Sequence, residues 1–239
     1  VSLPKWDLNL VLTYLNSDKF EPMCQVSLEA ITLKTTFLLA LATGKRVSEL
    51  HALSRQQDYI VKRTDGALIL HCNPLFLAKT QLPDMRPKPI VLLPLKPGEV
   101  GDLSLCPVRA VNCYLQETNS VSHSDRLLLR WAGKKTQIFP QTLSSWIRRV
   151  IQEAYAFADV PLPPMRRASH EVRALASSYA YMNNVALTDL LEAVLMIFCG
   201  TSFLLCSNLD AEITISFKFV DFGDRKIVSP TFDFNIDSL

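Results

Sequence analysis

The sequence lacks a hydrophobic run long enough to cross a membrane. Its longest apolar stretch without charge, residues 193–209, is interrupted by glycine, threonine, serine and asparagine. It falls short of the roughly 20 strongly apolar residues that a membrane span needs. No basic leader with a cleavage site opens the chain. We therefore expect a fragment without a targeting segment and without a membrane partner.

Cysteine pairs of the kind that bind metals or form redox centres are also missing. None of the cysteines belongs to a C-x-x-C pair, and none has a histidine at ligand spacing. The six cysteines are Cys24, Cys72, Cys106, Cys113, Cys199 and Cys206. We expect them to be reduced, mostly buried thiols of an intracellular protein, and we expect no metal.

The composition is that of a globular protein with an uneven charge. Of the 239 residues 49% are apolar and 20% charged, which fits one large domain, or one domain with an appendage. Residues 28–173 carry 20 basic against 12 acidic side chains, whereas residues 174–239 carry 3 against 8. A basic body of this kind favours a polyanion such as double-stranded DNA. An ordinary solvated basic surface is the alternative.

The order of patterns predicts an α+β protein that is mainly helical, with a small antiparallel sheet. A serine cap and a closing Gly44 delimit the first long helix, and Pro107 and Pro140 each stand at the start of a later one. Ser169 is the predicted cap of a final helix. The expected helices are residues 27–43, a short one from 46, 107–118, 140–158 and 170–184, with strands in 58–63, 67–72 and 89–95.

An arginine directly after a glycine break is the first candidate site residue. Residues 44–50 read GKRVSEL, which places Arg46 at a helix N-terminus and Glu49 three residues later. The helix dipole disfavours a cation there, unless it and the free N–H groups jointly face a phosphate. Glu49 would then orient the guanidinium. A plain surface pair of Arg46 and Glu49 is the alternative.

Two further motifs carry groups suited to phosphate chemistry. His170 and Arg173 lie at i and i+3 on one helical face, where they would hold the non-bridging oxygens of a phosphodiester and handle its protons. An incidental basic pair on a capped helix is the alternative. Lys79 stands on the approach to a hairpin turn, a position from which an ammonium can reach a leaving oxygen.

The order and wording of these motifs resemble a known family. GKRVSEL on a helix, a lysine near a short sheet, and SHEVRALASSYAY on a later helix resemble the catalytic domain of the tyrosine recombinases, the phage-integrase family, over residues 28–193. More narrowly, WDLNLVLTYL, FEP, FLAKTQ and the flanks of GKRVSEL resemble the recombinases of DIRS-type retrotransposons.

The resemblance implies an enzyme of DNA recombination and integration of a mobile element, acting in the nucleus without metal, nucleotide or other cofactor. In this family a tyrosine attacks the scissile phosphate and remains joined to its 3′ side. By the resemblance, Arg46 and Arg173 clamp the phosphate, and Lys79 protonates the departing 5′ oxygen. His170 assists proton transfer or holds the phosphate, and Glu49 supports Arg46.

A DNA partner also implies backbone contacts by other basic side chains. The residues that we expect to contact DNA are Lys45, Arg148, Arg149, Arg166 and Arg167. Self-association on DNA is expected as well, since some relatives donate the tyrosine from a neighbouring subunit.

The nucleophile is where the chain departs from the family pattern. Residues 194–196 read VLM where the family has glycine and histidine or tryptophan, and no tyrosine follows Tyr181. We interpret Tyr179 and Tyr181 as core aromatics, and we give Cys206 no role because it lacks cationic neighbours. We therefore expect no strand cleavage in cis. A DNA-binding module without enzymatic activity, or a decayed gene product, are the alternatives.

The match also predicts three regions of the chain. Residues 1–26 are expected to be a remnant or linker of a missing N-terminal DNA-binding domain, and residues 27–194 the recombinase-like domain. Residues 195–239 are expected to be a divergent, poorly packed tail, such as a frameshift or a retained intron would produce.

Overall fold

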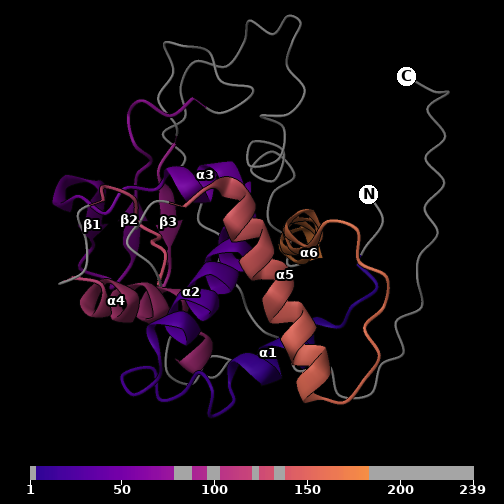
Figure 1. Ribbon diagram of the computed structural model, residues 1–239. Helices are drawn as coiled ribbons and strands as arrows, with labels where there is room; N and C mark the ends of the chain where they lie inside the picture. The colour runs from indigo at the N-terminus through magenta and orange to yellow at the C-terminus, as the bar shows by residue number, and fades with distance from the viewer. Residues whose placement is uncertain (1–3, 78–87, 96–102, 120–123, 132–137, 183–239) are drawn as a thin grey trace, which may run out of the picture.

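The computed structural model describes residues 4–77, 88–95, 103–119, 124–131 and 138–182. It is mostly helical with one small antiparallel sheet, as the sequence predicted (Figure 1). The described α-helices are α1 (Leu8–Leu15), α2 (Leu28–Thr43), α3 (Val47–Ala52), α4 (Pro107–Glu117), α5 (Pro140–Phe157) and α6 (Ala168–Met182). The remaining elements are the 3-10 turns η1 (Gln57–Tyr59) and η2 (Leu103–Leu105), and the strands β1 (Ile60–Lys62), β2 (Leu68–Leu70) and β3 (Ile90–Leu92).

Helix α2 is the central element of the fold. Of its 16 residues 13 are buried, because α4, α5 and α6 all pack against it. The Ser27 hydroxyl accepts from the Ala30 N–H at 3.2 Å, which caps the first turn. Gly44 ends the helix in the left-handed region, with φ 58°, and donates its N–H to the Ala40 carbonyl. Both predicted ends of this helix are confirmed.

The sheet is a meander of three short strands in the order β1-β2-β3. Ile60 pairs with Leu70, and Leu70 pairs with Ile90, so that both ladders are antiparallel. Alternate residues of β2 and β3 are buried, with Leu68 and Leu70 facing the core. The predicted small antiparallel sheet is confirmed.

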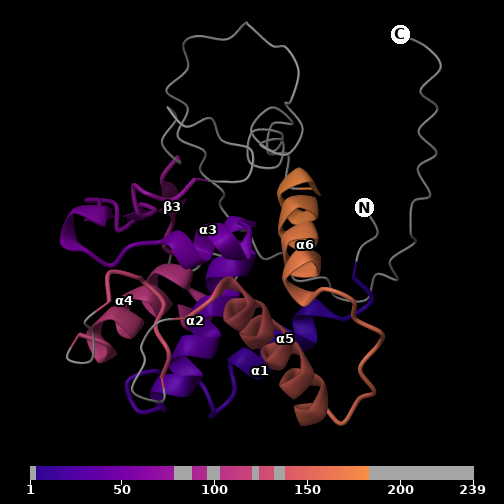
Figure 2. The same ribbon diagram turned by 45° about the horizontal axis from the view of Figure 1, so that its top comes forward.

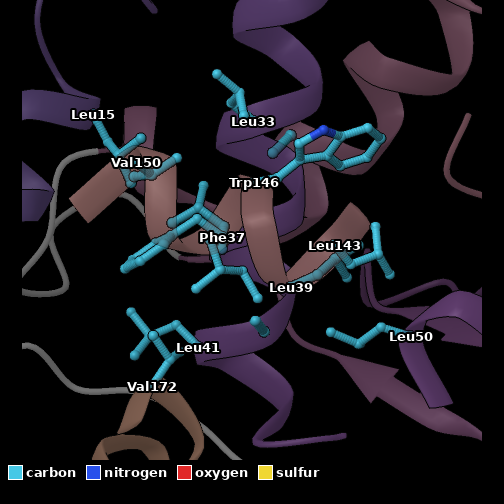
Figure 3. Close-up of a cluster of buried hydrophobic side chains, with 14 of the residues drawn as sticks. Leu15, Leu33, Phe37, Leu39, Leu41, Leu50, Leu143, Trp146, Val150 and Val172 are labelled. Carbon is cyan, nitrogen blue, oxygen red and sulfur yellow. The ribbon is translucent and has the colours of Figure 1, made fainter. Parts of the chain in front are cut away.

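The core joins helices that are far apart in the sequence. Figure 3 shows side chains of α1, α2, α3, α5 and α6 in one cluster, among them Leu15, Phe37, Leu50, Val150 and Val172. Because α3 and α6 each contribute to this cluster, their positions relative to α2 are set by packing.

The N-terminal segment belongs to the same core. Val11 and Leu15 of α1, and Phe20 and Met23 of the following turn, have no exposed surface. The predicted boundary at residue 27 therefore does not separate a packed domain from an unpacked linker. The predicted tail, residues 195–239, lies outside the described residues.

The start of α6 differs slightly from the sequence prediction. The helix begins at Ala168, so Ser169 lies inside its first turn and is not its cap. The Ser169 hydroxyl lies 3.2 Å from that of Ser144 on α5. Within the described residues, no helix is long and apolar enough to span a membrane.

Candidate phosphate-binding site

The end of α2, the start of α3 and the middle of α6 meet at Gly44. A Cβ built on Gly44 would lie 3.5 Å from the Ala176 Cβ, so the two backbones pass close to each other. Figure 2 shows α3 following α2, with α6 beside them. Arg46 lies two residues after Gly44, and Arg173 lies almost one helical turn before Ala176. The fold thus brings together two arginines that are 127 positions apart in the sequence.

Arg46 is close enough to the Arg173 guanidinium to act on it electrostatically. The pKa of Arg173 is lowered, first by burial and then by the positive charge of Arg46, while Glu49 acts in the opposite direction. Both arginines are half-buried. Within the described part of the chain, neither guanidinium has a hydrogen bond or an ion pair. Two neighbouring guanidinium groups that are not hydrogen-bonded to a carboxylate favour binding of an anion.

Glu49 holds the start of α3 and does not hold the Arg46 side chain. Its Oε2 accepts from the backbone N–H of Arg46 at 2.8 Å, which satisfies a free donor of the first turn. The predicted contact between Glu49 and the Arg46 guanidinium is therefore wrong, and the alternative surface pair of these side chains is not formed either. Glu49 instead places its negative charge within reach of Arg173.

His170 lies on the first turn of α6, is exposed, and precedes Arg173 by three residues. That spacing puts both side chains on one face of the helix, as the sequence indicated. Lys79 and Cys206 lie outside the described residues. Tyr179 and Tyr181 belong to α6, but their side chains are outside the description as well.

The other predicted DNA contacts differ in their exposure and in the hydrogen bonds that they make. Lys45 is half-buried beside Arg46, and Arg166 and Arg167 are exposed just before α6. Arg148 donates from Nη2 to the Arg166 carbonyl at 2.9 Å, which ties α5 to the start of α6.

Arg149 is paired with carboxylates of α2 and α5. It pairs with Glu29 of α2 through Nη1 and with Glu153 through Nε at 2.7 Å. Its pKa is raised by the hydrogen bond to Glu153. The DNA contact of Arg149 stays a prediction, but the sequence did not reveal its partner Glu29, which lies 120 positions earlier and reaches Arg149 only after α2 and α5 pack.

A third arginine beside α3 was not predicted from the sequence. Arg126 donates from Nη1 to the His51 carbonyl at the end of α3, at 3.2 Å. Arg126 and Lys45 both lower the pKa of Cys72, although burial, the largest effect, raises it to about 11. The sequence around Arg126 does not predict this position, because Arg126 is brought to α3 by an isolated β-bridge with Ser54.

His51 is a structural side chain at the far end of α3. Its Nε2 lies 2.7 Å from the Ile138 carbonyl, and its pKa is lowered by burial and by the charge of Arg126. The ring is therefore mostly uncharged at neutral pH. Within the described residues, no cluster of histidine, cysteine and carboxylate side chains is suited to hold a metal. The chemistry that these residues offer is anion binding by guanidinium groups.

Comparison with known protein families, with curated proteins and with solved structures found no match.

Proposed function

We propose that the chain is a DNA-binding domain of the tyrosine-recombinase type, in which Arg46 and Arg173 hold one phosphate of the DNA backbone. The single observation that supports it most is the meeting of these two half-buried guanidinium groups at the junction of α2 and α3. The motif resemblance requires this meeting, and nothing in the local sequence dictates it.

Charge and chemistry support the same proposal. A guanidinium presents several donors in a rigid fork that matches two oxygens of a phosphate. Neither the Arg46 nor the Arg173 guanidinium is hydrogen-bonded to a carboxylate among the described residues, which leaves their donors available for a phosphodiester. Lys45 and Arg126 add positive charge near α3, where both act on Cys72. Neighbouring phosphates of a DNA strand would find counter-charges there.

The proposal is tested by the affinity for a fluorescently labelled DNA duplex, measured by anisotropy at several salt concentrations. We expect R46A and R173A each to weaken binding about 10- to 100-fold, as for a lost charge-assisted hydrogen bond. Each should also reduce the salt slope by about one, because one phosphate contact is lost. R173K should weaken binding as well, because lysine keeps the charge but not the fork.

R63A is the matched control, because it removes one positive charge from the β1–β2 turn, where Arg63 pairs with Asp65 at 3.1 Å. We expect it to change the affinity by about twofold or less. Equal effects of R63A, R46A and R173A would mean that only net charge matters, and the phosphate clamp would be excluded.

Strand cleavage is a separate question, because no tyrosine follows Tyr181 in the chain. A nicked suicide duplex traps a covalent protein–DNA adduct when a tyrosine attacks. We propose binding without an adduct for this chain alone. An adduct formed by the chain alone would assign it a nucleophile. An adduct formed only with a second, tyrosine-bearing recombinase would support donation in trans.

A further inference from the structure

One carboxylate in the middle of the His170–Arg173 motif is held from the opposite end of the chain. Trp6 is 4% exposed, and its indole Nε1 donates to Glu171 Oε2 at 2.9 Å. The other oxygen, Oε1, accepts the backbone N–H groups of Arg166 at 3.0 Å and Arg167 at 3.3 Å. Glu171 therefore receives three donors, and two of them belong to the segment that opens α6.

These contacts fix the first turn of α6. A helix start has free N–H groups, and a carboxylate that accepts them stabilises the turn. Trp6 is in turn held by its neighbour, since the Asp7 N–H donates to the Tyr155 hydroxyl of α5 at 2.7 Å. The N-terminal segment passes close to the start of α6 in both views (Figures 1 and 2). His170 and Arg173 project from the part of α6 that this segment anchors.

The Glu171 side chain leaves α6 on a different face from Arg173. Residues 171 and 173 are about 200° apart around a helix, on nearly opposite faces. The charges that act on the Arg173 guanidinium are those of Arg46 and Glu49, and Glu171 is not among them. While Trp6 holds the Glu171 carboxylate, that negative charge stays away from the two arginines.

We propose that Trp6 and Glu171 are positioning residues of the phosphate site. They fix the turn that carries His170 and Arg173, and they keep the carboxylate between these two residues turned away from the bound phosphate. This inference rests on the proposed function, because it concerns the same Arg46–Arg173 site. The N-terminal segment thereby becomes part of the DNA-binding apparatus without touching DNA.

The experiment combines W6F with R173A in the full chain and measures the affinity for the labelled duplex. W6F keeps an aromatic ring in the core but removes the indole N–H. We expect W6F alone to weaken binding about three- to tenfold, and to have no further effect in the R173A background, since it acts through Arg173. Thermal unfolding verifies that each variant is folded at the assay temperature.

A second variant, E171Q, tests the same contact from the other side. Glutamine keeps one accepting oxygen, so it cannot accept both the Trp6 indole N–H and the N–H groups of Arg166 and Arg167. Its control is E153Q, which also removes one negative charge, but far from the phosphate site. Glu153 shares the partner Arg149 with Glu29. Glu29 lies at the opposite end of α2 from Arg46, roughly 20 Å away by helix rise. We expect E171Q to bind DNA more weakly than E153Q. W131F, in a half-buried tryptophan on another segment, is the control for W6F and should bind like the parent chain.

Backbone hydrogen exchange of residues 168–173 gives a readout that does not depend on DNA. W6F and E171Q should speed exchange there, while W131F and E153Q should not. Unchanged exchange and unchanged affinity in W6F and E171Q would overturn the inference, as would a W6F effect of equal size with and without R173A. If R173A itself leaves DNA binding unchanged, the proposed function fails, and the positioning role fails with it.

Discussion

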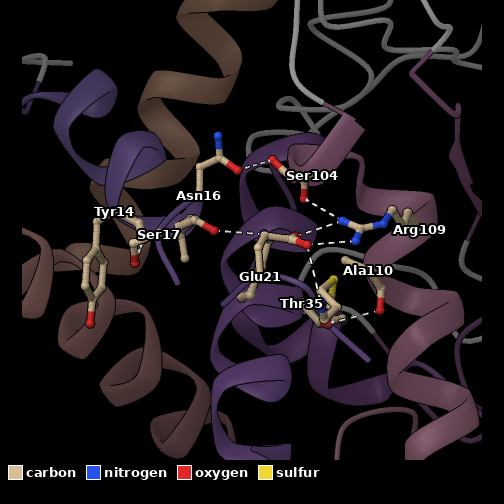
Figure 4. A network of polar contacts seen from close by, with 11 residues as sticks. Tyr14, Asn16, Ser17, Glu21, Thr35, Ser104, Arg109 and Ala110 are labelled. Atoms are coloured by element: carbon tan, nitrogen blue, oxygen red, sulfur yellow. Dashed lines mark hydrogen bonds and ion pairs between the residues drawn. The ribbon is translucent and has the colours of Figure 1, made fainter. Parts of the chain in front are cut away.

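Lys34 is completely buried within α2, and its ammonium pairs with the Glu21 carboxylate. Its Nζ donates to Glu21 Oε1 at 2.5 Å and to the Leu15 carbonyl at 2.8 Å. The same carboxylate accepts two bonds from Arg109 of α4, at 2.8 and 2.7 Å (Figure 4). Glu21 therefore joins the α1–α2 turn to two helices. A buried charge that loses its partner is costly, which makes Glu21 a sensitive position.

We expect E21Q to lower the free energy of unfolding by about 3 to 5 kcal/mol at neutral pH, because Lys34 would remain charged and buried. The measurement is urea denaturation followed by circular dichroism. K34M is the matched variant, since it removes the buried cation and leaves Glu21 paired with Arg109. It should be less destabilised than E21Q. An E21Q chain as stable as the parent at neutral pH would contradict the role of this pair.

The pH dependence of this effect follows from the pKa of Glu21. Burial alone would raise that pKa, but the hydrogen bonds and charges of Arg109 and Lys34 outweigh burial and lower it below the ordinary 4.5. Stability from a lowered carboxyl pKa is present above the ordinary value and is lost as the pH falls through the folded-state value. The difference between the parent chain and E21Q should therefore be full at neutral pH and shrink in acid.

At the scale of elements, the junction of α2 and α3 depends on one glycine. Gly44 has a φ angle of 58°, in the left-handed region of the backbone. Residues other than glycine and asparagine rarely adopt this conformation. Space is not the constraint, since an added Cβ would meet the Ala176 Cβ at an ordinary 3.5 Å. A substitution there would strain the backbone between the end of α2 and Arg46 without forcing α6 away.

We expect G44A to lower the free energy of unfolding by about 1 to 2 kcal/mol, and G44N to cost less, because asparagine tolerates the left-handed region. The midpoint of urea denaturation measures both. G66A is a matched control for backbone strain in the β1–β2 turn, at φ 85°, away from Arg46. If G44A and G44N are equally destabilised, contact with Ala176 rather than the backbone angle sets the cost.

Elements with local end signals were predictable from the sequence, and contacts between distant segments were not. Ser27 and Gly44 marked α2 because a cap and a left-handed glycine act within one turn. Arg46 and Arg173 were brought together only by the family resemblance, because no local pattern shows that α6 passes Gly44. The ion pair of Arg149 with Glu29 was not foreseen for the same reason, since the two residues are remote in the sequence.

The position of the candidate site is set by several elements of the described core together. Arg46 is placed by α2 and α3, and Arg173 by α6. The start of α6 is held by α5 through Arg148 and by the N-terminal segment through Trp6. A segment that the sequence assigned to a linker thus takes part both in the core and in the positioning of the site.

The N-terminal segment contributes to the core as a unit. Deleting residues 1–26 would expose the surfaces that Val11, Leu15, Phe20 and Met23 cover, all of them fully buried. A single large-to-small change in a core costs about 2 to 5 kcal/mol, whereas a whole domain is stable by only about 5 to 15 kcal/mol. We therefore expect the truncated chain to show no cooperative unfolding transition in urea.

Two point variants separate lost packing from mere shortening of the chain. F20A removes a fully buried ring and should lower the free energy of unfolding by about 3 to 5 kcal/mol. F157A removes a ring that is 61% exposed at the end of α5, and should cost about 1 kcal/mol or less. The role of residues 1–26 in the core would be contradicted by cooperative unfolding of the truncated chain, or by an F20A chain that is as stable as F157A. Residues 1–26 would then be a linker. Residues 27–194 would then be a domain that folds alone, since the buried surface of α1 would contribute nothing that the remaining helices do not supply.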